Sequence, residues 1–349
     1  MSGLSLPRFP HHLQQKRNNF RPTVLLHTPR PRRHQQWARK MKKTTVLSFT
    51  GEAEAAAEEA DENVCANCGI AGVDNIKLKE CSDCDLVKYC STNCREDHRE
   101  QHKHVCKIRA DELHDKPLFT QPDGTHEGEC PICFLPMPLD PQKSSFMSCC
   151  GNTICMGCCY AHIVSNIHDE VKASTCVFCR TPNLDEEERG KRERERIEAN
   201  DAPTLCFMGT GGYEEGDYDK AVEYWTRAAE LGDAEAHYRL GLMYEKGEGV
   251  EKDEEKEVYH LEKAAIGGHP YARHNLACSE AGNRRYERAA KHWIISANLG
   301  DEASMKALLP CCKGGYITKD EYGATLRTHQ AAVDAMKSAQ RDAAEKENF

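Results

Sequence analysis

The chain has 349 residues, of which 39% are hydrophobic and 30% are charged, and its formal net charge is −9. This length accommodates two to four domains. No segment approaches the roughly 18 consecutive apolar residues that a membrane span requires, so we expect no membrane segment. The charge is segregated along the chain: eleven Lys and Arg fall in residues 1–43, and the first acidic residue is Glu52.

Residues 1–62 form a basic and then acidic stretch that is polar and broken by proline. Such a segment buries too little apolar surface to offset its conformational entropy, so we expect disorder. Basic clusters lie in residues 30–33 and 39–43. They are open to three interpretations: a solvated tail, a nuclear localisation signal or an organelle transit peptide. Nucleic-acid binding is a weaker interpretation because the segment lacks a pattern of stacking aromatic residues.

Cysteine is the unusual component of the composition. The chain has 20 cysteines, and all but four of them lie between Cys65 and Cys179, mostly in C-x-x-C pairs. A secreted disulfide scaffold and an intracellular zinc protein are the two alternatives. A secretory signal needs an unbroken apolar region, and residues 1–43 have none. We therefore expect reduced thiols that bind zinc, in the cytoplasm or the nucleus.

The first cysteine-rich segment carries eight residues of zinc-ligand type in four pairs. A C-x2-C knuckle delivers two thiolates to one ion, and C-x3-C or H-x3-C places two side chains one helical turn apart. Eight ligands make two tetrahedral zinc sites. A segment of this length has almost no apolar core, so metal must stabilise it. The predicted ligands are Cys65, Cys68, Cys81, Cys84, Cys90, Cys94, His102 and Cys106.

This string resembles a MYND finger at all eight positions, which defines a domain over residues 63–108 and a linker over 109–127. The resemblance implies an interleaved topology, with Cys65, Cys68, Cys90 and Cys94 on one ion and the remaining four on the other. It also implies binding of proline-containing peptides. Arg99 stands where the family usually has Trp, which places that activity in doubt.

The second segment, residues 128–183, contains another set of pairs and resembles a RING finger. Apolar residues Ile163, Ile167 and Val171 recur at helical spacing and predict its central helix. Two ligand positions are open, because Asn152 aligns with the usual histidine and a neutral amide is a poor zinc ligand. We favour the adjacent thiols at that position. The predicted ligands are Cys130, Cys133, Cys149, Cys150, Cys155, Cys158, Cys176 and Cys179.

The resemblance to a RING implies binding of an E2 ubiquitin-conjugating enzyme and no catalytic side chain in this chain. The contact positions would be Ile132 and Pro182, with Arg180 bridging the E2 enzyme and ubiquitin. The chemical gain would be orientation of the conjugate. A charged segment over 184–200 follows and predicts a solvated helix.

Residues 201–340 contain repeats. The sequence AAELG at 228–232 recurs as AAIGG at 264–268 and as SANLG at 296–300, at intervals of 36 and 32 residues. The pattern predicts helices over 234–245, 253–265, 271–280 and 302–309. The full copy at 233–268 resembles a Sel1-like repeat, a helix-turn-helix solenoid that displays partner-binding surfaces. Residues 341–349 are expected to be a tail.

The sequence thus predicts a multidomain fold: two small cross-braced zinc modules followed by an all-α helix-turn-helix solenoid. We expect four zinc ions. The predicted function is a RING-type E3 ubiquitin ligase that uses an E2 enzyme and recruits a protein substrate through the repeats and the MYND-type module. The alternative is a non-enzymatic interaction adaptor. The thiols Cys159, Cys206, Cys278, Cys311 and Cys312 are expected to be core or incidental residues.

Overall fold

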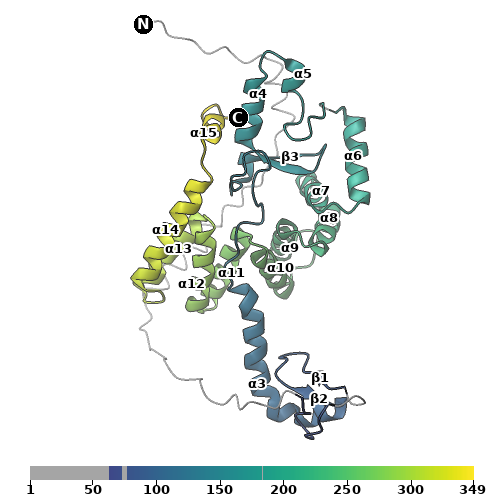
Figure 1. Ribbon diagram of the computed structural model, residues 1–349, viewed down its shortest axis with the longest axis vertical. Helices are drawn as coiled ribbons and strands as arrows, with labels where there is room; N and C mark the ends of the chain where they lie inside the picture. Colours follow the sequence, from purple (N-terminus) through teal and green to yellow (C-terminus); the bar gives the residue numbers. More distant parts are fainter. Residues whose placement is uncertain (1–62, 73–76, 183) are drawn as a thin grey trace. The chain divides into compact units, whose positions relative to one another are not determined.

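The computed structural model describes residues 63–72, 77–182 and 184–349, so the predictions for residues 1–62 lie outside the described part of the chain. The described residues fall into two compact units, one ending at Pro122 and the other beginning at Asp123 (Figure 1). Among these residues no helix combines the length and the apolar character that a membrane crossing requires.

The first unit is a two-stranded ribbon followed by one long helix. Strand β1 (Lys79–Glu80) pairs antiparallel with β2 (Lys88–Tyr89), and helix α3 spans Thr92–Leu118. The hydroxyl of Ser91 caps α3 by accepting a hydrogen bond from the backbone N–H of Cys94. The buried cluster beside the ribbon consists of Cys65, Cys81, Cys84 and Tyr89. Predicted metal ligands, rather than aliphatic side chains, therefore form its centre.

Helix α3 continues well past the predicted end of the first module at residue 108. It runs through residues that were expected to form a linker and ends at Leu118. Residues 107–116 contain neither glycine nor proline, so nothing in them interrupts the helix. Pro117 lies in its final turn, and the backbone N–H of Phe119 closes the helix on Asp115.

The second unit begins with a small module of mixed structure. A short 3-10 turn η2 (Pro141–Lys143) leads into β3 (Ser144–Met147), which pairs antiparallel with β4 (Asn152–Cys155). Helix α4 (Met156–Ser165) and the single turn α5 (Glu170–Ala173) follow. The ribbon and α4 enclose Met137 and Ile154 together with three cysteines.

The predicted central helix of this module was too long. Helix α4 ends at Ser165, and the side-chain amide of Asn166 donates to the carbonyl of His162. Asp169 then caps the separate turn α5. Ile167 consequently lies between the two helices, and Val171 is 72% exposed. The helical spacing of these two residues does not reflect a shared buried face.

Helix α6 (Glu186–Glu198) confirms the helix expected in the charged segment. It is fixed at its C-terminal end, because the guanidinium of Arg196 donates to the hydroxyl of Thr204 and to the carboxylate of Asp201. Arg196 also lies directly over Gly151 in the β3–β4 turn. The charged helix therefore contacts both the small module and the start of the repeats.

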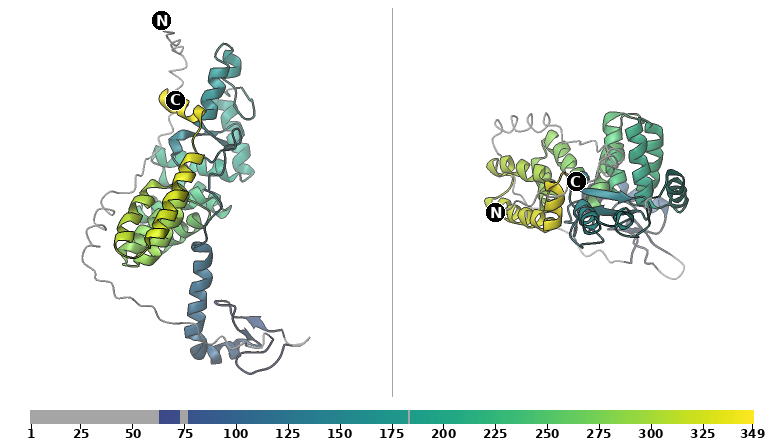
Figure 2. Two further views of the ribbon diagram at one scale, coloured as in Figure 1. Left: turned by 60° about the vertical axis from the view of Figure 1, so that its left-hand side comes forward. Right: turned by 90° about the horizontal axis from the view of Figure 1, so that it is seen from above.

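Eight helices then form stacked antiparallel pairs, which confirms the all-helical solenoid (Figures 1 and 2). The four predicted helices correspond to α9, α10, α11 and α13 within a few residues. The pairs are α7 (Ala202–Glu215) with α8 (Tyr218–Glu230), α9 (Ala234–Lys246) with α10 (Glu254–Ile266), α11 (Pro270–Gly282) with α12 (Tyr286–Asn298), and α13 (Glu302–Lys313) with α14 (Lys319–Ala335).

The first helix of each pair begins with the same device. A side chain at the N-cap accepts a hydrogen bond from the backbone N–H three residues later, which satisfies a free donor of the first turn. The residues are Asp201, Asp233, His269 and Asp301. The last three follow a glycine at positive φ, which explains why glycine ends each of the repeated five-residue sequences.

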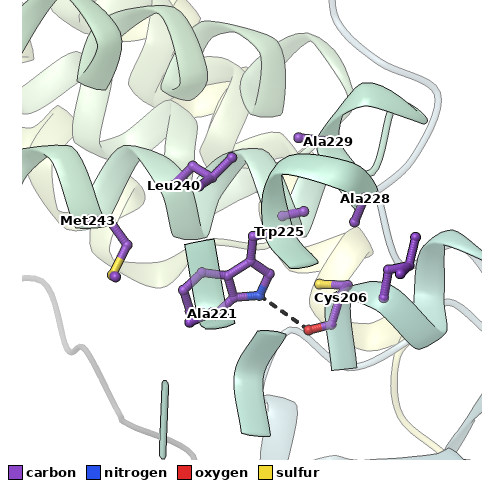
Figure 3. Close-up of a cluster of buried hydrophobic side chains, with 9 residues drawn as sticks. Cys206, Ala221, Trp225, Ala228, Ala229, Leu240 and Met243 are labelled. Atoms are coloured by element: carbon purple, nitrogen blue, oxygen red, sulfur yellow. Dashed lines mark hydrogen bonds between the residues drawn. The ribbon is translucent and has the colours of Figure 1, made fainter. Parts of the chain in front are cut away.

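Trp225 on α8 anchors the core of the first repeat (Figure 3). It is 1% exposed, and its indole N–H donates to the carbonyl of Cys206 at 3.2 Å. Gly209 on α7 permits this packing, because a Cβ atom there would lie 2.6 Å from Trp225 Cδ1. Cys206 is buried in the same cluster, in line with the expectation of a core thiol.

The end of the chain is an ordered element rather than the expected tail. Helix α15 (Ala339–Lys346) packs along α4 of the small module (Figure 1). Ser338 caps α15, and Ala344 is 2% exposed in the contact. The prediction of a tail was wrong because the segment forms a capped helix whose backbone packs against Gly157 of α4.

Candidate metal centres

Four groups of cysteine and histidine side chains converge in the described part of the chain. Within each group the potential ligand atoms all lie within 4.8 Å of one another. Every predicted metal-ligating residue belongs to one of them. The groups are Cys65, Cys68, Cys90, Cys94; Cys81, Cys84, His102, Cys106; Cys130, Cys133, Cys155, Cys158; and Cys149, Cys150, Cys176, Cys179.

The sulfur separations distinguish metal binding from disulfide bonding. Sulfur pairs lie 3.5 Å apart for Cys68 and Cys90, 3.8 Å for Cys81 and Cys106, and 3.9 Å for Cys130 and Cys158. A disulfide requires about 2.05 Å. Tetrahedral zinc with Zn–S bonds of about 2.3 Å places its sulfurs about 3.8 Å apart. All 20 cysteines are free thiols, and the four groups fit a zinc ion in size and in donor chemistry.

The two groups of the first unit use the ribbon and α3 together. Cys94, His102 and Cys106 all lie on α3, with His102 and Cys106 one turn apart, and His102 Nε2 lies 3.1 Å from the sulfur of Cys84. Burial, followed by the neighbouring His98, lowers the pKa of His102, which keeps its imidazole in the neutral form that binds metal. His98 instead contacts the hydroxyl of Tyr89 at 3.0 Å, as expected for a residue outside both groups.

In the fourth group the adjacent thiols Cys149 and Cys150 both converge with the last cysteine pair. A tight turn brings the backbone N–H groups of Cys150 and Gly151 to the carbonyl of Met147. Through this turn both Cys149 and Cys150 approach the last cysteine pair, at 3.5 Å from Cys179 and 3.9 Å from Cys176. The side-chain amide of Asn152 donates to the carbonyl of Cys150, so its role is in the turn.

The two groups of the second unit alternate along the sequence. The pairs 130/133 and 155/158 form one group, and the pairs 149/150 and 176/179 form the other. Two of the three C-x2-C pairs form knuckles closed by backbone hydrogen bonds, from Phe134 to Cys130 and from Arg180 to Cys176, and the pair 155/158 lies at the start of α4. Phe134 and Arg180 adopt positive φ to close these turns. Because the pairs alternate, each group joins two segments that have a pair of the other group between them. This interleaved arrangement is a cross-brace.

The electrostatics of the thiols favour a bound cation. In the first group burial raises the pKa of Cys65, but backbone hydrogen bonds outweigh burial and lower it to about 6. Hydrogen bonds with Cys68 and Cys65 raise the pKa of Cys90 to about 12. The thiols of one group thus cannot all ionise by themselves at neutral pH. A divalent ion supplies the charge that stabilises four thiolates together.

The three expected E2 contact residues are accessible. Ile132 is 37% exposed in the first knuckle, and Arg180 and Pro182 are exposed at the second. Sequence reasoning missed two large neighbours, Phe134 at 71% exposure and Phe178 at 43%. Phe178 lies inside the second knuckle and Phe134 directly follows the first, and this position of a large apolar residue in or beside a knuckle was the signal that could have identified them.

A fifth group, His126, Glu235 and His269, was not predicted because its members are distant in sequence. The two imidazole rings are stacked, and the Nε2 atoms of both face the same carboxylate oxygen of Glu235. Nδ1 of His269 accepts the Ala272 N–H, whereas a histidine that binds metal through Nε2 normally donates from Nδ1. We therefore interpret this group as an ion-pair and hydrogen-bond cluster.

Comparison with known families agrees with this geometry. The MYND finger family matches residues 65–106. The Sel1 repeat family matches residues 200–233 and 234–269, so the segment before the full copy is itself a repeat. Both families are protein-interaction modules. The MYND-type module and the Sel1 repeats identified from the sequence are thereby supported, and the cysteine groups indicate zinc binding.

Individual relatives cover only parts of the chain. It is 39% identical over 57 residues to "DAP3-binding cell death enhancer 1" of Mus musculus, a match covering 16% of this chain and 11% of that protein. Among solved structures, a Sel1 repeat protein from Oxalobacter formigenes is 29% identical, with 45% of this chain and 67% of that chain covered and a TM-score of 0.38. The antigen c5321 of uropathogenic Escherichia coli, which has an SLR fold, is 24% identical over 44% and 34% of the chains, with a TM-score of 0.37.

Proposed function

We propose that this protein is a zinc-dependent RING-type E3 ubiquitin ligase. The observation that carries the proposal is the cross-brace in residues 130–179, where two four-sulfur groups alternate along the sequence. Two exposed knuckles project from it, with Ile132 on one and Arg180 on the other. We propose zinc at both groups, and at both groups of the MYND-type module.

The proposed chemistry is positioning. Ile132 and Pro182 would provide the apolar contact with the E2 enzyme. The planar guanidinium of Arg180 would donate hydrogen bonds to the E2 enzyme and to ubiquitin together, which a lysine ammonium cannot reproduce. Holding the conjugate in one reactive geometry accelerates transfer without an acid, base or nucleophile from this chain. The zinc ions have a structural role, because four protein ligands leave no open position.

The Sel1 repeats and the MYND-type module would recruit the substrate protein. Both families are interaction modules. The repeats and the cross-braced module belong to one compact unit, so a substrate held by the repeats would be held close to the charged E2 enzyme. This arrangement raises the effective concentration of the substrate at the reaction centre.

The test is autoubiquitination with purified E1, a panel of E2 enzymes, ubiquitin and ATP. We expect ubiquitin chains with at least one E2 enzyme, loss of activity in Cys130→Ser, and a reduction of at least tenfold in Arg180→Ala. Lys172→Ala is the matched control. Its ammonium is 70% exposed in the same module and pairs only locally with Asp169, so this variant should retain full activity.

A non-enzymatic adaptor is the second candidate. The matches to two interaction families favour it, and the mouse relative is named for binding another protein. Asn152 at the usual histidine position of a RING also leaves it open. An absence of ubiquitin chains with every E2 enzyme, from protein that carries its full zinc content, would favour the adaptor over the ligase.

A further inference from the structure

Arg341 on α15 reaches into the small zinc-binding module from far along the chain. Its Nη1 donates to the carbonyl of Pro136 at 2.7 Å and to that of Met336 at 2.6 Å. Its Nη2 faces the carbonyl of Leu135 at 3.4 Å and the sulfur of Cys133 at 3.6 Å. The guanidinium thus joins the end of α14, the loop after the first knuckle, and a predicted zinc ligand.

The backbone of Arg341 also packs closely against helix α4. A Cβ atom on Gly157 of α4 would lie 2.7 Å from the backbone nitrogen of Arg341 and 2.9 Å from its Cα. Phe349 packs edge-on against Tyr160 of α4, with ring centroids 5.4 Å apart. Glycine at 157 lets α15 approach α4, and this approach sets the position of the guanidinium.

The negative charge expected at the neighbouring zinc site favours a guanidinium beside Cys133. Four thiolates and one Zn²⁺ carry a formal charge of −2. The sulfurs belong to a buried cluster, in which Cys130 and Cys155 are fully buried. Buried negative charge is costly unless a positive group and hydrogen bonds compensate it. Arg341 provides both, because it is permanently charged and donates toward Cys133.

The same side chain fixes the loop that carries the ligands. Leu135 and Pro136, whose carbonyls face Arg341, lie two and three residues after Cys133, and the Cys130 backbone N–H donates to the carbonyl of Leu135. Holding these carbonyls holds the first knuckle in the shape that directs Cys130 and Cys133 to one point. Groups that orient metal ligands in this way typically change metal affinity 10-fold to 100-fold when they are removed.

We propose that Arg341 is a positioning residue of the zinc site formed by Cys130, Cys133, Cys155 and Cys158, so that retention of this one ion depends on the docking of helix α15. The inference rests on the zinc occupancy proposed above. It assigns to the end of the chain a metal-retaining role that is separate from substrate recruitment and from E2 binding.

The test is pulse alkylation of the full-length zinc-loaded protein with N-ethylmaleimide, with peptide mapping by mass spectrometry and native mass spectrometry of the zinc content. In Arg341→Ala we expect the four cysteines of this site to be alkylated about 10-fold to 100-fold faster than in the wild type. The cysteines of the MYND-type module should react at the wild-type rate. Arg341→Lys keeps the charge and loses the forked geometry, so it should fall between the two.

Two further variants separate docking from general damage. Gly157→Ala keeps the arginine in the sequence but displaces α15 and the guanidinium with it, so it should reproduce the faster alkylation. Glu345 lies on α15 as Arg341 does, and Glu345→Ala removes an exposed ion pair with Lys143 of η2, so this variant should match the wild type. Four retained zinc ions and unchanged alkylation in both Arg341→Ala and Gly157→Ala would overturn the inference alone. Wild-type protein with no zinc at these cysteines would overturn the proposed zinc occupancy as well.

Discussion

The imidazole rings of His126 and His269 stack on each other with their centroids 4.1 Å apart and an interplanar angle of 20°. Both face one carboxylate, because Glu235 Oε2 lies 2.8 Å from His269 Nε2 and 3.4 Å from His126 Nε2. Arg239 occupies the other oxygen of Glu235. This cluster attaches the segment before the cross-braced module to the second Sel1 repeat.

The two histidines are predicted to titrate on opposite sides of the usual histidine value of about 6.5. Burial opposes the charged form of His126, but the hydrogen bond and charge of Glu235, with Glu127 and Asp233, outweigh burial and raise its pKa. Burial and then the charge of His126 lower the pKa of His269 to about 4. NMR titration of the imidazole C–H signals measures both. In Glu235→Gln we expect the pKa of His126 to fall below 6.5.

The same shifts predict the pH dependence of stability. A raised folded pKa means that His126 stabilises the fold below about pH 6.5, and that this stabilisation is lost as the pH rises through the raised value. A lowered folded pKa means that the contribution of His269 is lost as the pH falls from about 6.5 toward about 4. Thermal unfolding across pH 5 to 9 should show His126→Gln without the alkaline loss. An identical pH profile in the variant and the wild type would contradict this assignment.

The fourth cysteine group makes a sharp prediction about neighbouring residues. Cys150 lies 3.9 Å from Cys176, whereas Asn152 only bonds the backbone of Cys150. We expect Cys150→Ser to lose one zinc ion in native mass spectrometry and Asn152→Ala to keep the full content. Loss of zinc from the Asn152 variant with retention in the Cys150 variant would reverse the ligand assignment.

Two glycines of α7 provide a matched pair for the repeat core. Gly209→Ala places a methyl group 2.6 Å from Trp225 Cδ1, so we expect the repeats to lose roughly 1 to 2 kcal/mol of unfolding free energy. Gly211 has no neighbouring atom within 4 Å of an added Cβ. Gly211→Ala should therefore be neutral or stabilising by up to about 1 kcal/mol. Urea unfolding followed by tryptophan fluorescence distinguishes them, and equal effects would argue against the packing of Trp225.

Metal removal should affect the two units differently. The first unit has ligand cysteines at its buried centre, so a strong chelator should unfold residues 77–91 of its ribbon. The Sel1 repeats have an aliphatic and aromatic core around Trp225 and should keep their thermal transition. Hydrogen exchange with mass spectrometry resolves the two regions. Protected ribbon amides after complete chelation would show that metal does not hold the first unit.

Periodic and paired features were predictable from the sequence, because each is set by local geometry. The repeated AAELG-type segments predicted helices α9, α10, α11 and α13. The spacing of the pairs predicted the residues that converge, and the resemblance to a MYND finger implied which of them share a group in the first module. The predicted repeat region began at residue 201 and so included α7 and α8, but no individual helix was predicted there; the family match shows that these two helices form a Sel1 repeat.

Features that depend on distant contacts were not predictable in this way. Arg341 is one charged residue in a short charged segment, and nothing local indicates that it meets Cys133. His269 stands where aspartate caps the first helix of the other three repeat pairs, which was a signal of something unusual. Its partner His126 lies in a segment without a pattern. The spacing of Ile163, Ile167 and Val171 predicted one helix where there are two. Helix α4 ends at its C-cap Asn166, and Asp169 caps the separate turn α5.

The contact between Cys133 and Arg341 spans 208 positions of the chain. A ribosome adds about 5 to 20 residues each second, so the cysteines emerge on the order of 10 to 40 s before the arginine that faces them. During that interval the nascent module either holds its ion without the contact from Arg341 or binds the ion only after this contact has formed. On the proposal made above, the nascent module reaches its full hold on the ion only after residue 341 has left the ribosome, and a chain that stops before this residue would hold the ion loosely.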